Sequence, residues 1–192
     1  MSQFNIHSIA QAPVAARSLL EGAQQKFGFI PNLLGSFAES PATLQAYLEL
    51  GALMGKTALT PVEQQVVLLA ASAENHCTYC VAAHSVIAKQ MVKADAAIVD
   101  ALRELQPLPD RKLEALAVFT RAVVKQRGHV DGKALDDFIG AGYNRAQVLD
   151  VVLGVTMKTL SNYANHIMHT PLDVQFQAQA WDAPSQCNKQ CA

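Results

Sequence analysis

Hydrophobic residues recur along this chain at the spacing of helix faces, and Ala and Leu dominate the segments that carry them. Residues three, four and seven apart share one face of a helix, whereas a half-buried strand alternates apolar and polar positions. The sequence shows no alternating β-branched run bounded by turns, which is the usual signature of a strand. The pattern therefore predicts an all-α fold.

Several of the predicted helices have a recognisable first turn. Residues 60–63 (TPVE) have the form of a capping box with proline at the first helical position. Residues 40–41 (SP), Asp110 and residues 144–147 (NRAQ) predict three further starts. Residues 170–173 (TPLD) resemble the first of these signals, so we expect another helix to begin there.

The most apolar helical segment follows Asn144. It contains VLDVVLGVTMKTL, which is apolar around most of the circumference of a helix. A helix of this kind is usually central to the core or to a subunit interface.

The composition narrows the class of protein. The 192 residues are 51% hydrophobic and only 16% charged, against about 25% charged in an average soluble domain. Because no stretch resembles a linker, we expect a single domain over residues 1–192. A surface this poor in charge favours a homo-oligomer.

Nucleic-acid and membrane functions are disfavoured. The net charge is −1 and the basic residues are scattered, unlike the basic patch of a nucleic-acid-binding protein. No apolar run has the length of a membrane span, and residues 1–20 lack the pattern of a secretory signal. We therefore expect a cytoplasmic protein whose thiols are kept reduced.

Candidate chemistry is concentrated in ENHCTYCVAAHS, residues 74–85. On a helix, Cys77, Cys80 and His84 fall on one stripe, with the imidazole one turn beyond the second cysteine. If a new helix begins within residues 75–76, both thiols lie near its first turn. Unpaired amides and a nearby histidine stabilise a thiolate there.

Two thiols three residues apart can reduce a peroxide. One thiolate attacks the O–O bond and becomes a sulfenic acid, and the other thiol condenses with it to form a disulfide and release water. Two other interpretations stay open. The first is a zinc site, for which this stretch offers three ligands plus His76 where four are needed. The second is a pair of inert buried cysteines.

Three stretches together resemble a known family. LTPVEQQVVLLAASAENHCTYCVAAH resembles the core motif of the alkylhydroperoxidase D-like, peroxidase-related branch of the carboxymuconolactone decarboxylase family. FGFIPNLLGSFAESPATLQAYLEL before it and GYNRAQVLDVVLGVTMKTLSNYANHIMHTPLD after it resemble flanking parts of the same proteins, so the resemblance covers residues 27–173. It implies an all-α fold assembled as trimers or hexamers, with no cofactor or metal.

The resemblance also implies roles for individual residues. Cys80 would be the peroxidatic cysteine, Cys77 the resolving cysteine and His84 part of a proton relay. The substrate would be an organic hydroperoxide, and an external dithiol would restore the thiols. The spacing of His84 and Cys80 independently favours this order. The decarboxylase branch generally lacks the cysteine pair, so the pair favours redox chemistry over decarboxylation of a small lactone. Decarboxylation stays an alternative, and so does a non-enzymatic, zinc-binding oligomeric protein.

One position departs from the family pattern. The family's relay usually includes a glutamate twelve residues before the first cysteine, where this chain has Gln65. Glutamine holds a hydrogen bond but cannot exchange a proton at working pH. Glu74, three residues before Cys77, is the other candidate carboxylate, and its alternative role is a solvated helix end.

The sequence also supports expectations for one tyrosine, one histidine and the two remaining cysteines. Tyr79 is expected to pack in the core. His166, next to Asn165, either caps its helix or reaches the cysteine pocket from its own or a neighbouring subunit. Cys187 and Cys191 lie in residues 182–192, which we expect to form a mobile polar tail.

Overall fold

The computed structural model describes residues 4–184, and this part of the chain is built from helices without a strand, which confirms the all-α prediction. Cys187 and Cys191 lie outside the described residues, as does most of the predicted tail. The elements are α1 (Val14–Phe27), α2 (Asn32–Phe37), α3 (Pro41–Met54), α4 (Pro61–Glu74), α5 (Thr78–Val86), the π-helix η1 (Ile87–Val92), α6 (Ala96–Arg103), α7 (Arg111–Lys125), α8 (Gly132–Gly140), α9 (Arg145–Met168) and the 3-10 helix η2 (Val174–Gln179).

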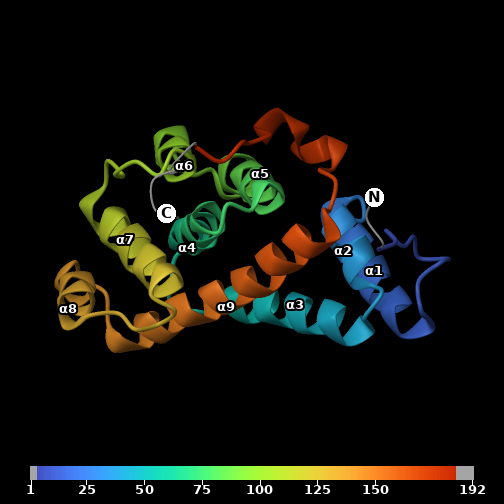
Figure 1. The fold of residues 1–192 in the computed structure, drawn as a ribbon, viewed down its shortest axis with the longest axis horizontal. Coiled ribbons are helices and arrows are strands. Elements are labelled where there is room, and N and C mark those ends of the chain that lie inside the picture. The colour runs from blue at the N-terminus through green and yellow to red at the C-terminus, as the bar shows by residue number, and fades with distance from the viewer. Residues whose placement is uncertain (1–3, 185–192) are drawn as a thin grey trace, which may run out of the picture.

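Helix α9 runs along the molecule and contacts helices from several parts of the chain (Figure 1). α3 lies beside it, α4 and α5 lie across from it, α7 and α8 are at one end, and α1 and α2 are at the other. The last described segment, which includes η2, returns over α5 toward α6. No helix in residues 4–184 combines the length and the hydropathy needed to cross a bilayer.

The predicted helix starts are mostly confirmed. Thr60 and Glu63 form a reciprocal capping box at the start of α4, and Asn144 and Gln147 form another at the start of α9. α3 begins directly after the predicted cap at residue 40, and α7 begins after the predicted cap Asp110. Local capping chemistry therefore sets these boundaries.

The start predicted at residues 170–173 is wrong. These residues are not helical, and the short helix η2 begins only at Val174. The carboxylate of Asp173 is engaged elsewhere: it accepts a hydrogen bond from the Tyr79 hydroxyl at 2.5 Å and from the backbone N–H of Asn32 at 3.0 Å. Because Asp173 bonds to distant elements, it does not close a capping box of its own.

Two clusters of buried apolar side chains hold the helices together. One is built mainly on α4, α6 and α7 and includes Val151 in the first turns of α9. The other is built mainly on α1, α2 and α5 and includes Met168 at the end of α9. Between these ends the buried face of α9 turns polar, with Lys158, Ser161 and Asn165 all buried. α9 therefore carries an apolar anchor near each end and polar side chains between them.

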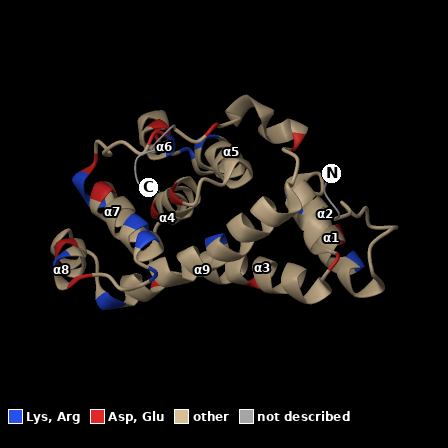
Figure 2. Ribbon diagram, in the orientation of Figure 1, with Lys and Arg blue, Asp and Glu red and all other residues tan. Residues whose placement is uncertain are grey.

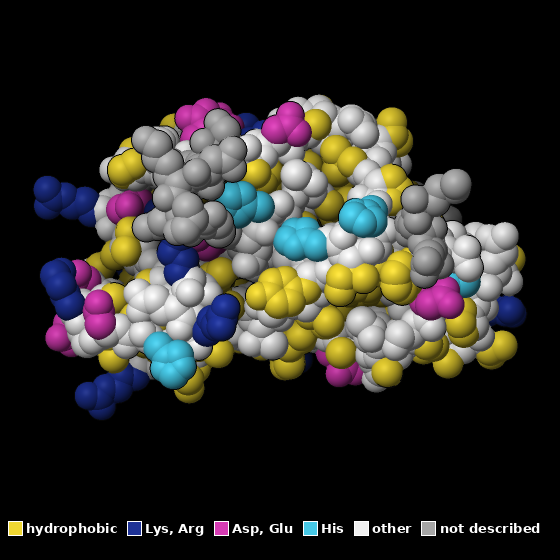
Figure 3. Space-filling model, in the orientation of Figure 1, with side chains coloured by type: hydrophobic (Ala, Val, Ile, Leu, Met, Phe, Trp, Pro, Cys, Tyr) yellow, Lys and Arg dark blue, Asp and Glu magenta, His cyan; other side chains and the backbone are white. Residues whose placement is uncertain are grey.

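The outward face of α9 is apolar. Leu149, Val152, Tyr163 and Ile167 are exposed along it at helical spacing. Charged residues are frequent around α6, α7 and α8 and sparse along α9 (Figure 2). A band of hydrophobic side chains crosses the middle of the face shown in Figure 3, next to several histidines. The prediction that this helix is central is thus confirmed for its inner face, and its outer face stays uncovered in the single chain.

The crossing of α9 with α4 depends on Gly154. A β-carbon at this position would lie 2.6 Å from Cγ1 of Val67 and 3.2 Å from Cε of Met54. We expect Gly154→Ala to lower the melting temperature, because overpacking costs about 1–3 kcal/mol, more than the roughly 1 kcal/mol that alanine gains in helix propensity. Gly22→Ala in α1, where no atom lies within 4 Å, is the control and should melt at the same or a higher temperature. Equal melting temperatures for the two variants would contradict the close crossing.

Candidate functional site

The turn between α4 and α5 places the first cysteine. α4 ends with Asn75 as its C-cap, and His76 then adopts the left-handed conformation with φ 56°. The backbone N–H of Cys77 donates to the carbonyl of Ser72 at 2.9 Å, and Cys77 is the N-cap residue of α5. The expected start within residues 75–76 is therefore wrong by about two residues, because His76 reverses the chain before the helix can begin.

Cys77 and Cys80 are two free, buried thiols at the amino-terminal end of α5. Cys80 is the third residue of that helix, within the turn whose backbone amides lack intrahelical partners. The predicted first-turn placement of both cysteines is thus confirmed. This end of a helix favours negative charge.

Helix α9 supplies the polar wall opposite the cysteines. The side-chain amide of Asn165 donates to the Cys80 sulfur at 3.3 Å and to the Cys77 sulfur at 3.7 Å. The Cys80 sulfur also lies 3.7 Å from the Ser161 hydroxyl. Lys158, Ser161 and Asn165 are three, four and seven positions apart, so they share one face of α9.

His84 is held between two side chains that fix its tautomer. Its Nδ1 lies 3.0 Å from Oε1 of Gln65, and its Nε2 lies 3.0 Å from the ammonium nitrogen of Lys158. An amide oxygen only accepts and an ammonium only donates, so Nδ1 carries the proton and Nε2 accepts. Burial and the neighbouring charge of Lys158 hold the pKa of His84 well below its usual value. The imidazole is therefore neutral.

The charges of the site are concentrated on Cys80 and Lys158. Burial alone would raise the pKa of the Cys80 thiol, but a hydrogen bond from Cys77 and the positive charge of Lys158 hold this pKa well below its usual value. The same hydrogen bond and burial raise the pKa of Cys77. Burial would lower the pKa of Lys158, yet the negative charge at Cys80 raises it overall. These shifts favour a thiolate at Cys80, a thiol at Cys77 and an ammonium at Lys158, whose side chain has no exposed surface.

Sequence reasoning missed Lys158, Ser161 and Tyr47. Tyr47 comes from α3, and burial raises the pKa of its hydroxyl while Lys158 opposes that shift. The available signal was a polar stripe at residues 158, 161 and 165 inside an otherwise apolar helix. Such a stripe marks the side of the helix that faces a buried polar partner.

The structure places Gln65 and Glu74, the two candidate relay residues, in different surroundings. Gln65 lies in the site, hydrogen-bonded to His84 as described. The carboxylate of Glu74 instead pairs with Lys125 on α7 at 3.3 Å, and among the described residues it makes no hydrogen bond with either cysteine or with His84. Glu74 therefore has a structural partner and lacks a direct contact with the thiols.

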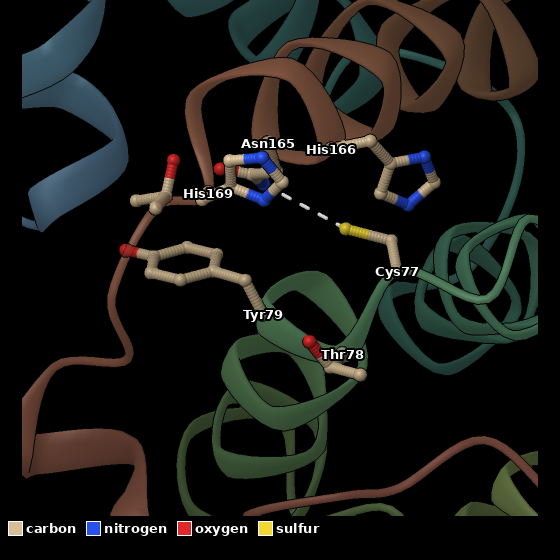
Figure 4. A pocket seen from close by; sticks show the side chains of 7 residues that line it. Cys77, Thr78, Tyr79, Asn165, His166 and His169 are labelled. Carbon is tan, nitrogen blue, oxygen red and sulfur yellow. Dashed lines mark hydrogen bonds between the residues drawn. The ribbon is translucent and has the colours of Figure 1, made fainter. Parts of the chain in front are cut away.

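A pocket of about 290 Å³ opens beside Cys77 (Figure 4). Its wall includes Tyr79 from α5 and His166 and His169 from the end of α9. His166 thus reaches the cysteine pocket from the same chain. Asn165 also lines this pocket, and its Oδ1 is a buried acceptor without a hydrogen-bond partner.

The prediction that Tyr79 packs in the core is confirmed. Its ring meets Phe176 edge to face, and its hydroxyl donates to Asp173. Among residues 4–184, no group of three or more His, Cys, Asp or Glu side chains lies close enough to hold a metal ion. The zinc interpretation lacks its ligand set in this part of the chain.

Residues 41–121 match the model of the carboxymuconolactone decarboxylase family. The matched range contains both cysteines, His84 and Gln65, so the predicted resemblance to this family is confirmed over residues 41–121. A search of curated protein sequences finds no match.

Solved structures extend the likeness to nearly the whole chain. The peroxidase-related protein from Ralstonia eutropha JMP134, described as an alkylhydroperoxidase AhpD core, is 25% identical with a TM-score of 0.81, over 91% of this chain and 94% of its own. A peroxidase-related protein from Silicibacter sp. TM1040 is 18% identical with a TM-score of 0.78, over 92% and 93% of the two chains. The debrominase Bmp8 in complex with 2,3,4-tribromopyrrole is 18% identical with a TM-score of 0.79, over 93% and 96%. The fold is therefore alkylhydroperoxidase D-like.

The charge of Lys158 can be tested by titration. In protein with Cys187 and Cys191 changed to serine, thiolate absorbance in the ultraviolet should persist as the pH falls well below 8.5, the ordinary pKa of a cysteine. In Lys158→Met the cation is gone, so we expect the absorbance to disappear as the pH falls through about 8.5 or higher. Lys125→Met removes an exposed lysine and should leave the titration unchanged. A low-pH thiolate that survives in Lys158→Met would contradict the assignment.

Proposed function

We propose that this protein is a thiol-dependent hydroperoxide reductase that cycles Cys77 and Cys80 between dithiol and disulfide. The observation that carries the proposal is the pair of free, buried thiols of Cys77 and Cys80, whose sulfurs both lie within hydrogen-bond distance of the Asn165 amide. The buried Lys158, on the same face of α9 as Asn165, lowers the pKa of Cys80. A thiolate is the nucleophile in this chemistry, and a second thiol at hand is what a sulfenic acid needs to form a disulfide. The peroxidase-related neighbours in fold support the same reaction class.

In the first step the Cys80 thiolate attacks the terminal oxygen of an organic hydroperoxide. The S–O bond forms as the O–O bond breaks, so Cys80 becomes a sulfenic acid and the substrate leaves as an alkoxide. Loss of the thiolate leaves the Lys158 ammonium buried without its anion, which favours release of a proton to the alkoxide. The product is an alcohol.

In the second step the Cys77 thiol attacks the sulfur of the Cys80 sulfenic acid. The disulfide forms, and the hydroxyl leaves with the thiol proton as water. His84 holds the Lys158 amine through Nε2, and Gln65 fixes the His84 tautomer, so both act by positioning. An external dithiol then returns the disulfide to the reduced state, with the proton returning to Lys158.

Two other reactions stay as alternatives to test. Decarboxylation of a small lactone would not need the cysteines. Dehalogenation is the other, because one neighbour in fold is a debrominase solved with 2,3,4-tribromopyrrole. The unpartnered Oδ1 of Asn165 suits the N–H of a pyrrole as well as the O–H of a hydroperoxide.

The direct test counts thiols. Protein with Cys187 and Cys191 changed to serine should lose two thiols per chain after one equivalent of cumene hydroperoxide, because Cys80 and Cys77 end as a disulfide. Cys80→Ser should lose none, and Cys77→Ser should stop at a sulfenic acid, which dimedone traps. The loss is measured by thiol titration and mass spectrometry.

Three results would contradict the proposal. The first is no thiol loss over hours, the second is loss that survives Cys80→Ser, and the third is turnover of a lactone by the variant with Cys77 and Cys80 both changed to serine. Loss only with 2,3,4-tribromopyrrole would move the protein to the dehalogenating class.

The proposal includes a cytoplasmic homo-oligomer, a trimer or hexamer, with the outward face of α9 as the contact. The uncovered apolar side chains of that face and the charge-poor composition support it. Leu149→Lys with Ile167→Lys places two charges on this face and should lower the mass measured by light scattering. Met91→Lys, an exposed apolar residue on η1, is the control and should keep the mass. An unsubstituted protein that is already monomeric would contradict the assembly.

A further inference from the structure

The pocket beside Cys77 leads to one of the two cysteines. Its wall consists of residues 77–79 at the start of α5 and of four residues within the stretch 165–170, at the end of α9 and just beyond it (Figure 4). Cys80 is not among the residues that line it. Cys77 is only 1% exposed, so a molecule that reacts with its sulfur has to enter this pocket.

The wall of the pocket holds two polar groups with an unpartnered atom. Asn165 and Thr170 both line it, and Oδ1 of Asn165 and Oγ1 of Thr170 are each buried without a hydrogen-bond partner. Buried polar atoms nearly always have a partner in a folded protein. The amide oxygen of Asn165 needs a donor, and the hydroxyl of Thr170 is able to donate or accept. These two atoms therefore suit a ligand that carries amide groups.

The charge of the wall favours a ligand that reacts as an anion. No Asp, Glu, Lys or Arg of the described chain lines the pocket, whereas the exposed residues His166 and His169 do. No side chain caps the start of α5, where backbone amides lack intrahelical partners and favour negative charge. An imidazole is able to take a proton from a thiol. The other titratable groups of the wall are the Cys77 sulfur and the hydroxyl of Tyr79, which donates to Asp173.

The volume of the pocket limits the size of its ligand. At about 290 Å³ it lies near the lower end of the roughly 300–1,000 Å³ that is typical of small-molecule sites. A small molecule fits an opening of this size, and the surface of a folded protein does not. The ligand that the wall describes is therefore small and hydrophilic, carries amide groups and reacts as a thiolate.

We propose that this pocket binds a small hydrophilic thiol that attacks the Cys77 sulfur and so reduces the Cys77–Cys80 disulfide. The inference rests on the proposed function, since the disulfide is the product of that cycle. An imidazole of the wall takes the proton of the thiol. The thiolate then bonds to the Cys77 sulfur, and the Cys77–Cys80 bond breaks with its electron pair on Cys80.

A second thiol completes the reduction. It attacks the ligand sulfur of the mixed disulfide, which releases Cys77 and leaves the two ligand thiols joined as a disulfide. The two thiols thus give up two electrons. Of their two protons, one ends on Cys77 and the other restores the charge of Lys158, so the site returns to its reduced state.

The leaving group also favours attack at Cys77. A thiolate that attacks one sulfur of a disulfide expels the other, and the thiol of lower pKa leaves faster. Attack at Cys77 expels Cys80, whose sulfur accepts a hydrogen bond from the Asn165 amide at 3.3 Å and lies 3.7 Å from the Ser161 hydroxyl. The pKa of Cys80 is held well below its usual value, whereas that of Cys77 is raised.

The first experiment locates the attacked sulfur. In protein with Cys187 and Cys191 changed to serine, the Cys77–Cys80 disulfide is formed with diamide, so the result does not depend on any reaction with a peroxide. One equivalent of reduced glutathione, a small thiol with amide groups, is added, and the mixture is acid-quenched at successive times and mapped by mass spectrometry. Glutathione should be found on Cys77. Glutathione on Cys80, or reduction without an adduct on Cys77, would overturn the inference.

The second experiment tests the imidazoles. His166→Gln with His169→Gln should slow the reduction by glutathione roughly tenfold or more at about pH 7, because the wall then lacks its base. At about pH 9.5 most of the glutathione is already a thiolate, so the difference should shrink. His129→Gln, an exposed histidine before α8, is the control and should reduce at the unsubstituted rate. An equal loss at both pH values would overturn the role of the imidazoles.

The third experiment tests the class of the thiol. At equal thiolate concentration, glutathione should reduce the disulfide faster than 2-mercaptoethanol, which has no amide group. Thr170→Val removes one of the unpartnered atoms, so the advantage of glutathione should become smaller. Equal rates for the two thiols in the unsubstituted protein would overturn the inference. Failure of a hydroperoxide to form the Cys77–Cys80 disulfide would instead count against the proposed function.

Discussion

A lysine side chain with no exposed surface keeps its charge only where the protein supplies an anion and a hydrogen-bond acceptor. Here the acceptor is Nε2 of His84 and the anion is the sulfur of Cys80. Lys158 therefore contributes to the ionisation of both neighbours. Together with a hydrogen bond from Cys77 it lowers the pKa of Cys80, and burial together with its charge lowers the pKa of His84. The two cysteines differ in the direction of their pKa shifts. The hydrogen bond with Cys80 and burial raise the pKa of Cys77, which favours its thiol form.

Gln65 fits this arrangement better than the glutamate usual in the family. A carboxylate at that position would favour a protonated imidazole at His84, and that positive charge would lie 3.0 Å from the Lys158 ammonium. A neutral amide holds the imidazole ring by its Nδ1–H without adding charge. Gln65 and Lys158 therefore hold the two ring nitrogens of His84, and only Lys158 brings a charge to that contact.

The fold holds Lys158 against the cysteines from both ends. The apolar clusters anchor α9 near Val151 and Met168, and the polar stripe between them faces α5. The last described segment adds a second constraint on α5, since Asp173 binds the hydroxyl of Tyr79, the residue between the two cysteines. Burial of the polar groups beside the cysteines is tolerated because most of them are hydrogen-bonded, although Oδ1 of Asn165, a residue that lines the pocket, is buried without a hydrogen-bond partner.

The sequence by itself determined the helices, most of their first residues and the stripe of Cys77, Cys80 and His84, because capping and helical periodicity act between residues a few positions apart. Tertiary structure alone decided that Lys158 joins His84 across 74 positions and that Asp173 leaves its own predicted helix to bind Tyr79 across 94 positions. Those contacts depend on which faces of distant helices meet, and a local pattern holds no information about that choice.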